Sequence, residues 1–282
     1  MGSVAVAVQN LRARYVGSED WVLKGVNLEV REGEMLVLMG PSGCGKSTLL
    51  KVLAGLLPWV IPGTVEGAVY VAGVDVLKAG YRGLAGKVGV VYQNPEVQVV
   101  TRSVFEELAM APENLGLPKE EVRARVESVA RALHLEDHLF KDPQSLSGGE
   151  KQLIAIAGVL TMKPKVLLLD EPTSMLDHFG TKLVLDLITQ LKREYGLTII
   201  AAEHRVEWAV EVADRVAVMS DGVVVLEGTP SEVFSRVEEV QRYGVRPPGV
   251  SEVAYSLARM GFNLRIPVRL SEMEEMLKGG WR

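Results

Sequence analysis

The sequence predicts an α/β fold with a parallel or mixed sheet, because three apolar runs each end where a strand of a parallel sheet would deliver polar or flexible residues. These runs cover residues 35–39, 166–169 and 197–202. Gly40 follows the first run, Asp170 the second, and Glu203 and His204 the third. Strands buried on both faces of a parallel sheet have such uninterrupted apolar sequences, and α/β sheets present their ligand-binding residues at the carboxyl ends of the strands.

The segments around these runs fit the same fold. Short strands are expected over residues 4–8 and 26–30. A helix is expected from Lys46, because apolar residues then recur at spacings of three and four until Pro58 stops the pattern. Residues 95–143 are charged and helical without a strand-like run, which predicts an inserted helical lobe.

The C-terminal part is expected to be helical as well. Thr229 and Glu232 have the spacing of a capping box, which predicts a helix start. Two short amphipathic helices are expected in the tail, the first with Val253, Leu257 and Met260 on one face. The second is expected to begin at Ser271, with Glu274 completing a capping box.

Composition limits the class of protein. The 282 residues are 48% hydrophobic and 24% charged, which are ordinary values for a globular protein. The longest uncharged stretch, residues 52–65, is too short to cross a bilayer, and the N-terminus lacks the pattern of a secretory signal, so a cytoplasmic protein is expected. The net charge of −5 argues against a nucleic-acid partner. One cysteine excludes an internal disulfide, and the four histidines show no metal-site spacing.

A phosphate-binding loop is the strongest motif. Its pattern is matched at every fixed position by Gly40-Pro41-Ser42-Gly43-Cys44-Gly45-Lys46-Ser47. The loop lies between a predicted strand and a predicted helix, so backbone N–H groups and the helix dipole favour phosphate there. We expect Lys46 to neutralise the β and γ phosphates, Ser47 to offer its hydroxyl to Mg²⁺, and Thr48 to bond the α-phosphate. Cys44 is expected to be a small buried filler rather than a redox thiol.

Two adjacent carboxylates, Asp170 and Glu171, end the second apolar run. Because side chains alternate along a strand, they are expected to point in opposite directions. Asp170 would join the Mg²⁺ shell. Glu171 would face the γ-phosphate, where a general base or a water-orienting group is needed.

The segment Leu146-Ser147-Gly148-Gly149-Glu150-Lys151-Gln152, just upstream of Asp170, resembles the signature of ABC ATPases. In that family the serine and the two glycines bind the γ-phosphate of ATP held by the other subunit. The resemblance implies a P-loop NTPase core of the RecA-like type that binds ATP and Mg²⁺. It implies a core over 1–95 and 149–233, an ABC-type helical subdomain over 96–148, and a C-terminal dimerisation or accessory segment over 234–282.

The remaining elements of the family follow in the expected order. Tyr15 lies where the family stacks an aromatic ring on adenine, with Trp21 as a second candidate. Gln93 matches the glutamine that contacts Mg²⁺ and the attacking water, and Asp177 lies in a segment that resembles the loop crossing to the opposite subunit. His204 matches the switch histidine, so Glu171, His204, Gln93 and Lys46 are the expected catalytic residues. Glu203 stands where threonine is more usual; it could bond the histidine or face solvent.

Over residues 4–280 the chain resembles the ATPase subunits of energy-coupling factor importers, the group that includes cobalt and nickel uptake systems. Residues 93–98, 104–107 and 112–116 are similar to the region that receives the coupling helices of the membrane partner. The tail, with Tyr243, two prolines and Gly261, is similar to the dimerisation module. The resemblance implies ATP hydrolysis by a homodimer or heterodimer on an integral membrane protein. The pair would lie at the cytoplasmic face of the membrane and drive uptake of a vitamin, cobalt or nickel.

A soluble ABC ATPase, such as an iron–sulfur assembly ATPase, is the alternative. DNA-repair types insert long coiled coils between the halves of the site, but the span from Gln93 to Ser147 is short and lacks sustained heptads. Translation types usually carry two ATPase units in one chain, and this sequence shows one. A regulator that binds ATP without hydrolysing it would be expected to lack Glu171 or His204, and both are present.

Overall fold

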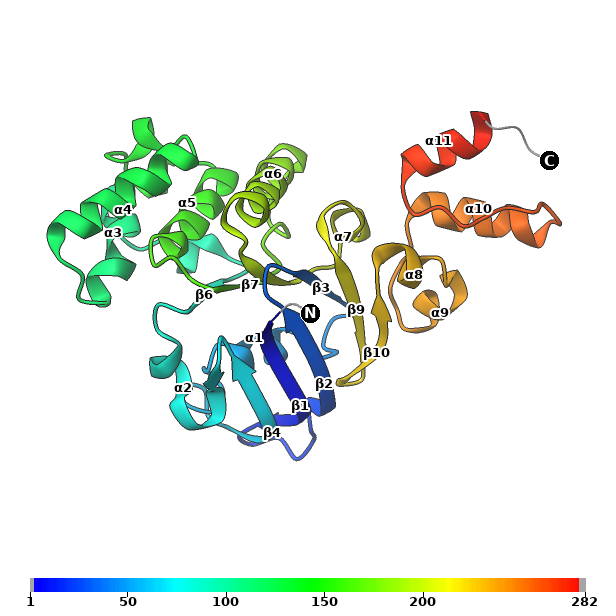
Figure 1. The fold of residues 1–282 in the computed structure, drawn as a ribbon, viewed down its shortest axis with the longest axis horizontal. Helices are drawn as coiled ribbons and strands as arrows, with labels where there is room; N and C mark the ends of the chain where they lie inside the picture. Colours follow the sequence, from blue (N-terminus) through cyan, green and yellow to red (C-terminus); the bar gives the residue numbers. More distant parts are fainter. Residues whose placement is uncertain (1–2, 279–282) are drawn as a thin grey trace.

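A computed structural model describes residues 3–278, so the outer limits of the predicted first and last domains lie outside the described residues. Its larger sheet has six strands in the order β10-β9-β3-β8-β7-β6 (Figure 1). The strands are β3 (Met35–Met39), β6 (Val88–Val91), β7 (Val166–Asp170), β8 (Thr198–Ala202), β9 (Arg215–Ser220) and β10 (Val223–Gly228). All neighbours from β9 to β6 are parallel, and β10 runs antiparallel to β9. The predicted α/β fold is confirmed, because the three apolar runs form β3, β7 and β8 side by side.

A second, antiparallel sheet of four strands in the order β2-β1-β4-β5 lies beside the first (Figure 1). Its strands are β1 (Val4–Tyr15), β2 (Leu23–Arg31), β4 (Gly63–Val71) and β5 (Val74–Asp75). The strands expected over 4–8 and 26–30 are therefore real but too short, and the separate sheet was not predicted. The physical reason in β1 is a bulge: the pairing with β2 shifts between Val8 and Leu11, and Asn10 has a φ of 45°. The apolar alternation breaks at that point.

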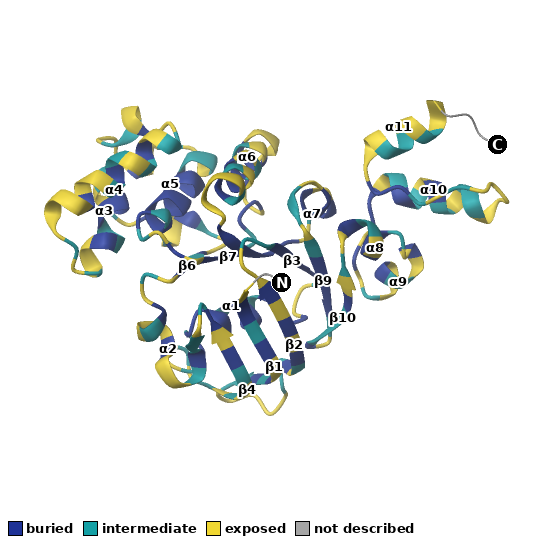
Figure 2. Ribbon diagram, viewed as in Figure 1, coloured by how far each residue is buried: buried dark blue, intermediate teal, exposed yellow. Residues whose placement is uncertain are grey.

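The larger sheet separates two apolar cores. Met35, Val37 and Met39 belong to one core, whereas Leu36 and Leu38 belong to the other. Strands β3, β7 and β8 are thus buried on both faces, which explains their uninterrupted apolar sequences. Figure 2 shows these buried strands at the centre of the molecule, with the exposed residues concentrated on the surrounding helices and loops.

The helices before the C-terminal part are α1 (Lys46–Leu53), α2 (Val76–Leu84), α3 (Val104–Asn114), α4 (Lys119–Ala132), α5 (Gly148–Leu160), α6 (His178–Tyr195) and α7 (Val206–Val212). Helices α1 and α5 contact strands of the larger sheet, whereas α2 contacts β4 and β5 of the smaller one. Helix α1 begins where predicted but ends at Leu53, before Pro58. The segment 95–143 is helical as predicted, with α3, α4 and three single-turn 3-10 helices at Pro95–Val97, Glu136–His138 and Pro143–Ser145. Buried residues of α3, α4 and α5 share one core with the sheet.

Four helices form the C-terminal part: α8 (Pro230–Phe234), α9 (Val237–Arg242), α10 (Gly249–Arg259) and α11 (Leu270–Lys278). The capping box of Thr229 and Glu232 is confirmed at α8. The one expected at Ser271 is wrong, because α11 already begins at Leu270 and Glu272 accepts the hydrogen bond from the Val268 N–H ahead of it. The expected stripe of α10 is exposed, with 52% of Val253 and 76% of Met260 accessible.

No helix within residues 3–278 has both the length and the apolar character required to cross a membrane.

Candidate active site

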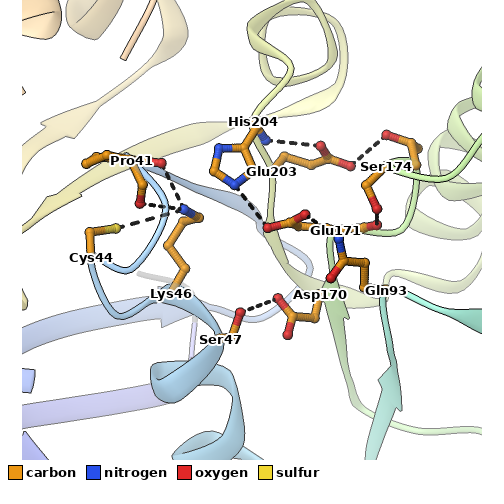
Figure 3. Close-up of polar contacts among 12 residues, drawn as sticks. Pro41, Cys44, Lys46, Ser47, Gln93, Asp170, Glu171, Ser174, Glu203 and His204 are labelled. Atoms are coloured by element: carbon orange, nitrogen blue, oxygen red, sulfur yellow. Dashed lines mark hydrogen bonds and ion pairs between the residues drawn. The ribbon is translucent and has the colours of Figure 1, made fainter. Parts of the chain in front are cut away.

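The predicted phosphate-binding loop connects the end of β3 to the start of α1. A Cβ atom at Gly40 would lie 2.2 Å from the carbonyl oxygen of Met219, and Gly45 has a φ of 110°, so both positions require glycine. Lys46 is buried, and its Nζ donates to the carbonyl oxygens of Gly40 at 2.8 Å and Pro41 at 3.2 Å (Figure 3). The ammonium group is therefore held against the loop, close to the free N–H groups that begin any helix. Cys44 is buried, as expected of a filler.

Ser47, in the first turn of α1, contacts Asp170 at the end of β7. The Ser47 hydroxyl donates to Asp170 Oδ1 at 2.8 Å. Burial raises the pKa of the Asp170 carboxyl, the hydrogen bond from Ser47 lowers it, and the charge of neighbouring Glu171 raises it further. A cation placed between these oxygens would stabilise the carboxylate, and oxygen ligands are those that Mg²⁺ prefers. The residues present therefore fit a Mg²⁺ ion.

Glu171 holds the centre of the site. Its Oε2 accepts a hydrogen bond from Gln93 Nε2 at 2.9 Å, and its Oε1 lies 3.0 Å from His204 Nε2 (Figure 3). The structure thus brings together three side chains that the sequence placed far apart, from residue 93 to residue 204. The carboxylate is oriented through both of its oxygens, as a general base or a water-orienting group requires.

The backbone explains why Asp170 and Glu171 face different partners. Strand β7 ends at Asp170, and Glu171 has a φ of 50° in the left-handed region. The divergence that was expected from strand alternation is present, but a turn produces it. Such a conformation costs about 1–3 kcal/mol in a residue other than glycine and persists only where surrounding contacts enforce it. One such contact is the hydrogen bond from the Glu171 N–H to the Ala202 carbonyl at 2.9 Å.

Ser147 begins helix α5. Its hydroxyl and its backbone N–H both donate to Glu150 Oε2, and the Glu150 N–H donates back to the hydroxyl, which forms a complete capping box. These hydrogen bonds lower the pKa of the Glu150 carboxyl. A Cβ atom at Gly149 would lie 3.2 Å from Gly180 Cα, so glycine allows α5 to approach the start of α6 closely. Across residues 3–278, no hydrogen bond or ion pair joins Ser147 to the phosphate-binding loop.

Asp177 and the two aromatic candidates have defined places. Asp177 caps α6, where its carboxylate accepts from the Gly180 N–H at 2.7 Å. The Tyr15 hydroxyl lies 3.0 Å from Thr48 Oγ1, beside the phosphate-binding loop. Trp21 instead stacks with two arginines, Arg12 and Arg14, at 4.5 and 4.9 Å from the ring centroid.

Two residues that flank His204 were not assigned a role from the sequence: Glu203 had two possible positions, and Arg205 was not predicted. Glu203 is buried and bonds the backbone of His204, so of its two expected positions the structure shows the first. No motif in the sequence predicted a role for Arg205, which directly follows His204 and whose guanidinium donates to Thr181 Oγ1 at 2.7 Å and to the Leu176 carbonyl at 3.3 Å. A cavity of about 820 Å³ lies elsewhere, between α4 and the carboxyl-terminal end of α6, and none of the predicted site residues lines it.

Comparisons with known proteins agree with this geometry. The sequence profile of the ABC transporter family matches residues 23–174. A protein of Pyrococcus abyssi, whose name places it among ABC transporter ATP-binding proteins, is 43% identical over 95% of this chain and 96% of its own length. The energy-coupling factor transporter ATP-binding protein EcfA1 of Caldanaerobacter subterraneus subsp. tengcongensis is also 43% identical, over 91% of this chain and 90% of the relative.

Two solved structures are similar to this chain over most of their length. One is cbiO1 from Clostridium perfringens, described as part of the ABC transporter complex cbiONQ, with a TM-score of 0.75 and 34% identity over 85% of this chain and 94% of that one. The other is the dimeric ATP-binding cassette MJ0796 in a post-hydrolysis state with ADP and Pi, with a TM-score of 0.69 and 29% identity over 80% and 98%. The chain therefore belongs to the ABC transporter ATPases. It is an ATP-binding and ATP-hydrolysing subunit of such a transporter.

Proposed function

We propose that this ATPase drives an energy-coupling factor type importer of a micronutrient, such as a vitamin, cobalt or nickel, from the cytoplasmic face of the membrane. The observation that carries the proposal is how far the likeness extends. The family profile ends at residue 174, whereas the likeness to EcfA1 covers 91% of the chain and the likeness to cbiO1 covers 85%. The second of these proteins, cbiO1, works as part of a transporter complex.

The proposed chemistry assigns each group at the site a task. Lys46 and the loop from Gly40 to Ser47 bind the phosphates of ATP, and Ser47, Asp170 and Gln93 would hold Mg²⁺, which would offset phosphate charge. Glu171 orients the attacking water and takes its proton, while Gln93 and His204 fix the carboxylate at its two oxygens. Tyr15 stacks on adenine. Its hydrogen bond to Thr48 supports this role, because it places the ring beside the phosphate-binding loop.

The proposed working unit is a pair of subunits that sandwich two ATP molecules. In it, Ser147, Gly148 and Gly149 of one chain bind the ATP held by the loop of the other, where the start of α5 favours phosphate. Asp177 crosses toward the same interface. The dimer of MJ0796 with ADP and Pi supports this arrangement.

We also propose three domains within the chain: a core of 1–95 and 149–233, a helical subdomain of 96–148 and a C-terminal dimerisation segment of 234–282. The exposed apolar face of α10 supports the last of these.

The proposed docking surface for the membrane partner is the segment 93–101. Val97 and Val100 are 68% and 67% exposed there. Two buried charges hold the segment from inside: Glu107 accepts from the N–H groups of Val100 at 3.0 Å and Thr101 at 3.2 Å, and Lys151 lies 3.4 Å from Glu96 Oε1. These contacts hold a loop that presents apolar side chains to the outside and that begins at Gln93 of the proposed catalytic site.

The test is capture of partners by the tagged full-length chain from detergent-solubilised membranes of its source, followed by mass spectrometry. We expect recovery of a polytopic membrane protein, with or without a second ATPase subunit. Val97→Asp should abolish that recovery, because it places a charge on the apolar contact surface. Val60→Asp is the matched control, since Val60 is 55% exposed and far from this segment in the chain, and it should leave recovery intact.

Other results would separate the alternatives. Recovery of soluble assembly factors alone would overturn the importer and favour an iron–sulfur assembly ATPase. Recovery of the membrane protein by both valine variants would leave transport in place and overturn the docking surface.

A further inference from the structure

Glu203 directly precedes the switch histidine, His204. Its side chain is hydrogen-bonded to the segment that follows Glu171. Its side chain is only 2% exposed. Oε1 accepts a hydrogen bond from Thr173 Oγ1 at 2.8 Å, and Oε2 accepts from the backbone N–H of His204 at 3.1 Å. Figure 3 shows the Glu203 side chain extending from beside His204 toward the segment that contains Ser174. The backbone N–H of Glu203 donates to the Leu38 carbonyl at 3.0 Å, which anchors the residue to β3.

Arg205, which directly follows the histidine, holds a later part of the same segment. Its Nη1 donates to Thr181 Oγ1 at 2.7 Å, and its Nη2 donates to the Leu176 carbonyl at 3.3 Å. These two acceptors lie on either side of Asp177, which caps α6. The residues before and after His204 are therefore both tied to residues 173–181, at three separate points.

The chemistry of position 203 is more specific than packing requires. A buried carboxylate is costly unless it is paired and hydrogen-bonded, and an apolar side chain of similar volume often stabilises a fold as well or better. Burial raises the pKa of the Glu203 carboxyl, and its hydrogen bonds and the nearby charge of Arg205 act against that rise. What the carboxylate adds is two acceptors that face in different directions, one toward a hydroxyl after β7 and one toward the histidine backbone.

We propose that Glu203 and Arg205 are positioning residues that lock His204 to the segment 173–181, so that this segment sets where the imidazole stands against Glu171. The inference rests on the roles given above to Glu171 and His204 in ATP hydrolysis. Because Asp177 lies within the segment, the lock also joins the surface that meets the second subunit to the catalytic histidine. A shift of the segment would move His204 with it.

The experiment compares steady-state ATP hydrolysis of the full-length variants Glu203→Leu, Arg205→Lys, His204→Ala and the double variant Glu203→Leu/His204→Ala. Leucine removes both acceptors, whereas glutamine could still accept from the His204 N–H and donate to the Thr173 hydroxyl. We expect Glu203→Leu to lower kcat by about 10- to 100-fold, as small displacements of catalytic groups do, while KM for ATP changes less than about threefold. Arg205→Lys should behave in the same way. In the His204→Ala background, Glu203→Leu should cost less than about twofold more, because it acts through the histidine.

Thr198→Val is the matched control. It removes a partly buried hydrogen bond, from the Gly33 N–H to Thr198 Oγ1 at 3.0 Å, at the opposite end of the strand that leads to Glu203. It should leave kcat within about twofold, and thermal unfolding of every variant separates misfolding from misplacement. If Glu203→Leu does not fold, Arg205→Lys carries the same test.

Each result is decisive. Unchanged kcat in His204→Ala would overturn the proposed role of the histidine and the lock with it. A large loss in His204→Ala with no loss in Glu203→Leu or Arg205→Lys would overturn the lock alone. Losses that multiply in the double variant would show that Glu203 acts independently of His204, which also overturns the lock.

Discussion

Replacement of Glu171 by glutamine tests the centre of the site with little change in shape. The amide keeps the length of the side chain and can still accept from Gln93, but it cannot take a proton from water and it places an NH₂ group or a neutral oxygen toward His204. Loss of a general base lowers the rate about 10²- to 10⁴-fold. At about 1.4 kcal/mol for each factor of ten, the barrier should rise by roughly 3–5 kcal/mol.

Binding should hardly change, because neither Lys46 nor Ser47 bonds Glu171: their partners are the loop carbonyls and Asp170. The assay is phosphate release at saturating ATP and Mg²⁺, together with equilibrium binding of ATP, for which we expect a change in Kd of less than about threefold. Glu127→Gln is the control, since this glutamate pairs with Arg123 on the surface of α4. If Glu171→Gln kept more than half of the wild-type rate, the assignment of the base would be wrong.

Three further predictions address the rest of the site. Lys46→Ala and Ser147→Ala should each be nearly inactive alone, but mixing them should restore hydrolysis, because one site of the mixed pair then has both an intact loop and an intact signature; no restored phosphate release would contradict the shared site. Tyr15→Ala should raise the Kd for ATP several-fold while Trp21→Ala leaves it unchanged, and the reverse result in a binding titration would assign the adenine contact to Trp21. The folded-state pKa of Glu150 is lowered from 4.5, so its capping bonds with Ser147 contribute stability above about pH 4.5 that is lost as the pH falls through the lower folded pKa. The stability deficit of Ser147→Ala, measured by chemical unfolding, should therefore shrink at acid pH, and a deficit that grew instead would show that the capping carboxylate is not the cause.

The parts of the fold that depend on unbroken patterns could be predicted from the sequence. The runs that form β3, β7 and β8 are apolar on both faces, and no polar residue interrupts them, so the length of each strand could be predicted. In β1 the bulge between Val8 and Leu11 interrupts the alternation, so both the strand length and the second sheet were missed. The start predicted for α11 was wrong for a related reason: Ser271 and Glu274 have capping-box spacing, but Glu272 makes the contact from one turn inside the helix.

The candidate site divides in the same way. Motif spacing predicted which side chains belong to it, and the structure places Glu171 against both Gln93 and His204. Spacing could not supply the left-handed turn at Glu171, since nothing in the residue type favours a positive φ. The partners of Glu203 were equally out of reach, because Thr173 becomes its neighbour only when β7 and β8 lie side by side in the sheet.

Three buried charged residues hold the loops to which the proposed function assigns contacts with other molecules. Glu107 and Lys151 hold the proposed membrane-docking segment, and Glu203 holds the segment proposed to meet the second subunit. A buried hydrogen-bonding group left without its partner costs about 1–3 kcal/mol, and more when it is charged. Each loop is therefore stable where its buried partner can reach it and unfavourable at intermediate positions. We therefore expect such loops to move as units with the site rather than to deform gradually, which would suit the coupling of ATP hydrolysis to a separate membrane protein.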